Sequence, residues 1–111
     1  MSEREQRLAR NEALFREVNE NIQKVAQQVA AAREEHVYEY CCECANVGCS
    51  ERVELTTAEY ERLRADATRF APVEGHELPE IETVVERFRG CVIVEKRDEA
   101  AEVAEQTDPR T

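Results

Sequence analysis

The sequence predicts a small α+β protein, in which a long N-terminal helix precedes a compact mixed α/β unit containing a zinc-stapled β-hairpin. Three observations support this class. Residues 3–34 lack Pro and Gly and space their apolar residues as a helix does. Residues 37–42 and 52–55 instead alternate in the manner of strands. Between these two segments, residues 41–49 hold four of the five cysteines.

The first expected element is the helix, which occupies most of a segment spanning residues 1–35. From Phe15 onward its apolar residues recur three or four apart and form a heptad-like seam, which Leu8 extends across a polar position at Asn11. The seam consists of Leu8, Phe15, Val18, Ile22, Val25, Val29 and Ala32. Two uses of this seam stay open: it covers the protein's own sheet, or it pairs with a partner, including a second copy of the chain.

The compact unit is expected over residues 36–97, starting with a strand at 37–42 and a returning strand at 52–55. Thr56 and Glu59 have the spacing of a capping box, which predicts a short helix through Arg64. A further strand is expected at 69–73, where Pro72 restricts it to an edge or a strand end.

The last part of this unit is expected to hold a second helix and a central strand. Pro79 favours a helix start, and Ile81, Val84, Val85 and Phe88 follow at i, i+3, i+4 and i+7. Gly90 is placed to end this helix. Residues 91–96 are the most β-prone run and predict a central strand, whereas residues 98–111 predict an acidic, disordered tail.

The cysteine cluster is the part of the sequence with evident site chemistry. Cys42, Cys44 and Cys49 have the spacing C-x-C-x4-C, which lets two thiolates at a strand end and a third after a turn reach one ion. Sulfur ligands bind Zn²⁺ strongly in tetrahedral geometry, which requires a fourth ligand. We expect His76, because Gly75 permits a tight backbone path there; Cys41 and His36 are the alternatives.

The predicted cofactor is therefore one zinc ion per chain, held by Cys42, Cys44, Cys49 and the fourth ligand. An iron–sulfur cluster is the competing interpretation, although it needs four ligands and a shielding apolar pocket. Cys91 lies in the β-prone run and is expected to pack as a small apolar residue.

The chain also resembles a group of short uncharacterised actinobacterial proteins. The resemblance covers about residues 5 to 97 and rests on Cys42-Glu43-Cys44, Cys49, Glu54-Leu55-Thr56, Glu59-Tyr60, Arg64-Ala65-Asp66 and Gly75-His76-Glu77. It implies that Cys42, Cys44, Cys49 and His76 form the site. Ala45-Asn46-Val47 departs from the Gly-Asp-Pro type of loop in that group, and the resemblance implies no activity.

Charge and motif content narrow the function classes. The net charge of −10 and the lack of a basic cluster argue against binding to nucleic acid or an anionic membrane. A charged start and the absence of a long apolar run predict a cytoplasmic protein without a signal peptide. No P-loop, GxGxxG, HExxH or GxSxG signature is present.

These observations favour a non-enzymatic structural-zinc protein that acts as a protein-interaction or regulatory module. Its partner is expected to be another protein, or a second copy bound through the N-terminal helix. The first alternative is a thiol and zinc redox-responsive switch. The second is a metal-dependent hydrolase, which would require an open position on the zinc.

Overall fold

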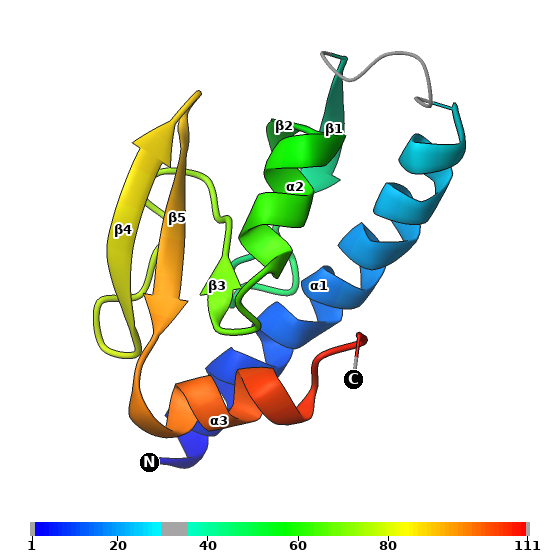
Figure 1. The fold of residues 1–111 in the computed structure, drawn as a ribbon. Helices are drawn as coiled ribbons and strands as arrows, with labels where there is room; N and C mark the ends of the chain where they lie inside the picture. The colour runs from blue at the N-terminus through cyan, green and yellow to red at the C-terminus, as the bar shows by residue number, and fades with distance from the viewer. Residues whose placement is uncertain (1, 30–35, 111) are drawn as a thin grey trace.

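The computed structural model describes residues 2–29 and 36–110, and the predicted helix end at 30–34 therefore lies outside the described residues. Its elements are α1 (Glu3–Val29), β1 (Val37–Cys41), β2 (Arg52–Thr56), α2 (Thr57–Arg64), β3 (Arg69–Phe70), β4 (Glu82–Phe88), β5 (Cys91–Lys96) and α3 (Asp98–Gln106). β1 and β2 form an antiparallel hairpin, and a separate antiparallel sheet has the order β3-β5-β4. In Figure 1, α1 runs along one edge of the molecule and the β4–β5 hairpin stands on the opposite side. The predicted α+β class is confirmed.

β5 is the central strand, as the sequence predicts, and both of its faces are buried. Cys91 and Ile93 point into a core shared with the β1–β2 hairpin and α2, where the rings of Tyr40 and Tyr60 stack with centroids 4.7 Å apart. The intervening side chains face a second cluster, formed by Val92, Val94, Phe70 and Ala104. The prediction of an edge strand was also right, because β3 pairs with β5 alone.

The helix predicted between Pro79 and Gly90 is wrong, because residues 82–88 form β4. The register between β4 and β5 shifts between Val84 and Glu86, which is a β-bulge at Val85. A bulge interrupts the two-residue alternation of a strand, so the apolar residues acquire a spacing that resembles a helix. Arg89 and Gly90 both have positive φ (50° and 77°), as in the type I′ turns that join two-residue hairpins.

The capping box at α2 is confirmed: the Thr56 hydroxyl accepts from Glu59 N–H, and the Glu59 carboxylate accepts from Thr56 N–H. The prediction of a disordered tail is wrong for residues 98–106, which form α3. Ala100 and Ala104 are buried on its inner face, where their small side chains let the helix pack closely. Its acidic composition conceals this short apolar face.

α1 packs on the domain with a different face from the one that its apolar seam predicts. Its buried face carries Glu12, Arg16, Asn19, Glu20 and Gln23, together with small alanines. Seam residues Val18, Val25 and Val29 are instead exposed, whereas Leu8 and Ile22 pack partly against the core. The prediction that the seam covers the protein's own sheet is therefore wrong for this part of the helix; Ala32 lies outside the described residues. Burial of the polar face is possible because distant elements supply hydrogen-bond partners for it.

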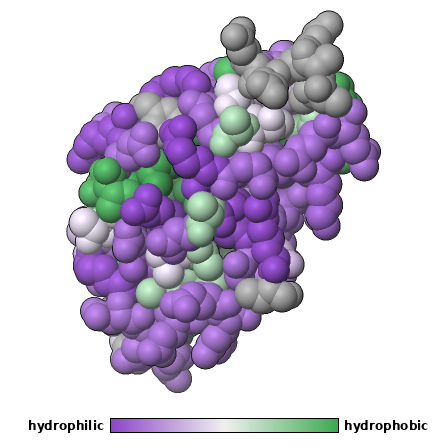
Figure 2. Space-filling view, viewed as in Figure 1, coloured by the Kyte–Doolittle hydropathy of each residue, from purple (hydrophilic) through white to green (hydrophobic). Residues whose placement is uncertain are grey.

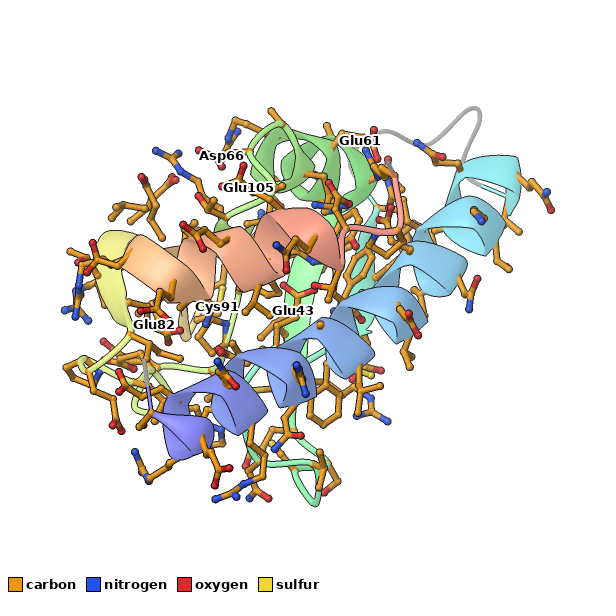
Figure 3. The ribbon with its side chains drawn as sticks, turned by 90° about the horizontal axis from the view of Figure 1, so that it is seen from below. Glu43, Glu61, Asp66, Glu82, Cys91 and Glu105 are labelled. Carbon is orange, nitrogen blue, oxygen red and sulfur yellow. The ribbon has the colours of Figure 1, made fainter. Side chains whose placement is uncertain are left out.

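The surface is largely hydrophilic on the face seen in Figure 2, with apolar side chains gathered over β4 and β5. Charged residues make up 36% of the sequence, so most of this face is polar despite the small core. Some acidic side chains are buried instead of lying on the surface. Glu43 and Glu82, both labelled in Figure 3, are among them.

Candidate metal centre

The cysteine loop leaves the end of β1 and returns to β2. Cys42 N–H donates to Glu51 O at 3.1 Å, which continues the hairpin pairing by one step. Beyond that point a tight turn forms, because Cys49 N–H donates to Asn46 O at 2.9 Å. The Asn46 side chain also accepts from Gly48 N–H at 3.0 Å, which is an Asx turn. This turn returns Cys49 toward Cys42 and Cys44.

His76 reaches the same place from the segment between β3 and β4. His76 N–H donates to Val73 O at 2.9 Å, which closes a turn in which Gly75 has φ +96°. Only glycine adopts that conformation at little cost, so the positive φ explains why this position is glycine. At the start of the turn, Val73 N–H donates to Cys42 Sγ at 3.2 Å. The two loops are thus already joined by one hydrogen bond to a sulfur atom.

The four predicted ligands lie together. One ligand atom from each of Cys42, Cys44, Cys49 and His76 can be chosen so that all lie within 4.8 Å of one another. His76 Nδ1 is 3.4 Å from Cys42 Sγ and 3.7 Å from Cys49 Sγ. The usual Zn–S and Zn–N bond lengths, at a tetrahedral angle, place sulfur and nitrogen about 3.6 Å apart. The described residues therefore form a Cys₃His group that could hold a metal ion.

The other two candidates for the fourth ligand lie elsewhere. Cys41 belongs to β1, where Asn19 bonds both its N–H (2.7 Å) and its carbonyl oxygen (2.9 Å), and its thiol is not part of the group. His36 is exposed and contacts the Tyr38 ring edge-on, with centroids 4.5 Å apart. Cys91 is buried in the core, as expected. The alternation of side chains along β1 explains why Cys41 and Cys42 point to different places.

The three thiols are electrostatically unequal. A hydrogen bond from Cys42 lowers the pKa of Cys44 to about 5, so Cys44 carries the negative charge of this pair. Donating that hydrogen bond, together with burial, raises the pKa of Cys42. Burial also raises the pKa of Cys49. A metal ion bound here would need all three as thiolates, so its binding would release protons.

Glu43, which lies between two of the cysteines, is the residue that the sequence reasoning missed. Its carboxylate is fully buried and accepts hydrogen bonds from Arg16 Nε (2.8 Å) and Nη2 (3.0 Å). Asn19 Nδ2 and Ala71 N–H donate to the same carboxylate, each at 3.0 Å. Glu43 therefore attaches the cysteine loop to α1 and to the segment after β3. Its position in Cys-Glu-Cys was the available signal, since alternation directs it away from the two sulfur atoms.

The fold and the site together define a small α+β protein with a Cys₃His group able to bind a metal ion. No protein-family model matches the chain, and the comparisons with curated proteins and with solved structures also found no match. The resemblance to short actinobacterial proteins therefore stays a prediction. Among the described residues, no helix combines the length and apolar character needed to cross a membrane.

Proposed function

We propose that this protein binds one structural zinc ion through Cys42, Cys44, Cys49 and His76. The observation that carries the proposal is the pair of sulfur–nitrogen separations, 3.4 and 3.7 Å, on either side of the value for a tetrahedral zinc site. The donors come from two loops, which are separated in the chain by β2, α2 and β3. The ion would tie the β1–β2 hairpin to the segment between β3 and β4.

The donor set favours zinc, because thiolate and imidazole in a tetrahedral arrangement suit that ion. Four protein ligands complete the coordination and leave no position for water or substrate, which supports a structural rather than a catalytic role. The proposal is therefore a non-enzymatic protein in which zinc fixes a surface for protein interaction. It requires a compartment that keeps thiols reduced, and the cytoplasm is one.

Substitution with cobalt(II) tests this site directly. We expect the cobalt protein to show the intense visible absorption of a tetrahedral ion and a thiolate-to-cobalt charge-transfer band. His76→Ala should change or abolish both features, whereas His36→Ala should leave them unaltered because His36 is exposed beside Tyr38. A weak spectrum typical of octahedral cobalt, unaffected by His76→Ala, would contradict the proposed site.

One observation favours a redox role as the second candidate. Cys42 and Cys44 are 1% and 2% exposed, but Cys49 and His76 are half-buried, so an oxidant can approach the group from one side. Peroxide would convert two metal-bound thiolates to a disulfide, with reduction of the peroxide to water and release of the ion. Reversible zinc release under mild peroxide, restored by a thiol reductant, would support this role; retention of zinc would exclude it.

A further inference from the structure

The outward face of α1 carries an apolar stripe that the described residues, 2–29 and 36–110, leave exposed. Leu14, Val18, Val25 and Val29 are 55%, 46%, 61% and 72% exposed. The buried polar face of the helix lies on the other side. Val18, Val25 and Val29 also line a groove of about 450 Å³ between α1 and β1, together with Asn21, Ile22, Ala26, Tyr38 and Glu39. Contiguous apolar surface of this kind marks an interaction site more often than isolated exposed side chains do.

The spacing of the residues in this stripe is symmetric about its centre. Its members, at positions 14, 18, 25 and 29, are separated by four, seven and four residues. When two such helices lie antiparallel across a two-fold axis, Leu14 of each meets Val29 of the other, and Val18 meets Val25. A surface that matches itself under a two-fold rotation is the requirement for an isologous dimer.

The charges beside the stripe fit nearly the same arrangement, because the midpoint of Glu17 and Lys24 lies one residue from the midpoint of the stripe. Across the two-fold axis the offset is two residues, or about 3 Å, which two long side chains can span. Glu17 and Lys24 are exposed, seven residues apart, and therefore on the same flank of the helix. An antiparallel copy brings Glu17 of one chain close to Lys24 of the other, and the two-fold axis repeats this pair. A parallel arrangement would instead place identical charges at equal heights.

We propose that the exposed face of α1 docks a second copy of this chain, with the two α1 helices antiparallel. The net charge of −10 on each chain opposes association. At physiological ionic strength the screening length is about 8 Å, which weakens that long-range repulsion more than the contacts between Glu17 and Lys24. The inference uses no residue of the metal centre and does not rest on the proposed zinc site.

Sedimentation of the purified protein, with its cysteines reduced, over a concentration series tests this proposal. We expect a species of twice the 12.8 kDa chain mass. Val18→Asp and Val25→Asp should each raise the dissociation constant by roughly 100-fold, as central interface residues do. Val85→Asp is the matched control, because Val85 is also exposed (44%) but lies in the bulge of β4. Helical circular dichroism and a cooperative denaturation transition verify that each variant is folded.

Charge reversal tests the antiparallel geometry. Glu17→Lys and Lys24→Glu should each weaken the dimer, and the double variant should recover most of the wild-type affinity. A chain that stays monomeric up to millimolar concentration would overturn the proposal, as would a dimer unaffected by Val18→Asp and Val25→Asp. A monomer that instead binds a synthetic basic amphipathic helix on this face would assign the groove to a different protein.

Discussion

The cysteine loop has a sulfur side, formed by Cys42, Cys44 and Cys49, and a carboxylate side, formed by Glu43. Each side attaches the loop to the rest of the protein, but through different interactions. On one side, Cys42, Cys44 and Cys49 meet His76 and present donor atoms that an ion would bring into full coordination. On the other side, the Glu43 carboxylate is already satisfied by Arg16 and by other donors of the protein itself. The carboxylate side is therefore held by contacts within the protein alone. We expect it to keep its structure when metal is removed, whereas the side that carries Cys42, Cys44 and Cys49 should loosen.

Glu43→Ala should have the largest effect on stability. It leaves the Arg16 guanidinium buried without its carboxylate, and breaking a buried pair in this way costs about 3–5 kcal/mol. Chemical denaturation measures the loss in the free energy of unfolding. Glu39→Ala is a suitable control, because Glu39 is an exposed glutamate on the neighbouring strand β1.

A double variant sharpens this first prediction. Arg16→Met combined with Glu43→Leu removes both charges and should cost much less than Glu43→Ala alone, because no unpaired charge remains buried. If the single and double variants lose the same free energy of unfolding, the stability of the loop does not depend on the Arg16–Glu43 ion pair. That result would contradict the role given to the carboxylate side.

Metal removal should have the next largest effect. At free zinc one hundred times the dissociation constant, binding stabilises the folded state by about 2.7 kcal/mol, and a chelator removes that contribution. Hydrogen exchange should then quicken at Cys49 N–H, which belongs to the sulfur side. Ala71 N–H should stay protected, because it donates to Glu43.

Cys44→Ser provides the control for chelation. This variant lacks one ligand, so the chelator should cause little further loss of stability. Equal loss in the variant and in the wild type would show that the chelator acts elsewhere. Loss of protection at both Cys49 and Ala71 would contradict a carboxylate side that keeps its structure when metal is removed.

The sequence predicted the sulfur side of the loop far better than the carboxylate side. Three ligands are close in the chain, and a glycine before His76 signalled the turn that brings the fourth. Glu43 gave no comparable signal, because a glutamate in a charged sequence is usually solvated. Its partners Arg16 and Ala71 come from distant elements, and periodicity carries no information about such pairs.

Two features of the fold, the packing face of α1 and the strand β4, also depend on contacts that periodicity does not report. Of the two uses that the sequence left open for the seam containing Val18 and Val25, covering the protein's own sheet is the usual one for an apolar face, and the structure does not show it. Paired polar groups can be buried instead, and the Arg16–Glu43 pair shows this on α1. The bulge at Val85 interrupts the alternation of β4, so the sequence pattern did not predict a strand there. The central strand β5 was easier to predict because its β-prone residues run without interruption.

The buried face of α1 also contributes to a second buried group of charged residues, whose effect on the free energy of unfolding should depend on pH. Glu12, Glu82 and Lys96 are buried together, with the Lys96 amine donating to both carboxylates. Burial raises the pKa of Glu12 well above 4.5, an effect that Lys96 opposes and Glu82 reinforces. The protonated form is thus favoured on folding. Its contribution to stability is complete below pH 4.5 and is lost as the pH rises through the folded-state pKa.

Glu12→Gln isolates this contribution, because the amide stays neutral. The free energy of unfolding of the wild type, minus that of Glu12→Gln, should fall with rising pH by up to about 1.4 kcal/mol per pH unit. Denaturation of both proteins across the same pH series measures this difference, and the metal's own pH dependence cancels between them. A difference that grows with pH would mean that Lys96 keeps Glu12 ionised.

A comparison of two glycines should show the smallest effect. Gly75 and Gly90 both have positive φ (96° and 77°), and an added Cβ would meet nothing within 4 Å at either position. Replacement by Ala should therefore cost about 1 kcal/mol at each site through backbone strain. Only Gly75→Ala should also weaken zinc binding, by roughly fivefold, because the turn positions His76. Isothermal titration of both variants with zinc tests this prediction. Equal zinc affinities would show that the turn at Gly75 does not position His76 for binding.

The most direct test of the proposed zinc site is native mass spectrometry of protein purified without added metal, together with His76→Ala and His36→Ala. We expect one zinc per chain in the wild type and in His36→Ala, and weakened or lost zinc in His76→Ala. Wild-type protein that carries no metal while its cysteines are reduced would contradict the proposed zinc site. Zinc retained at full occupancy in His76→Ala would contradict the assignment of the fourth ligand.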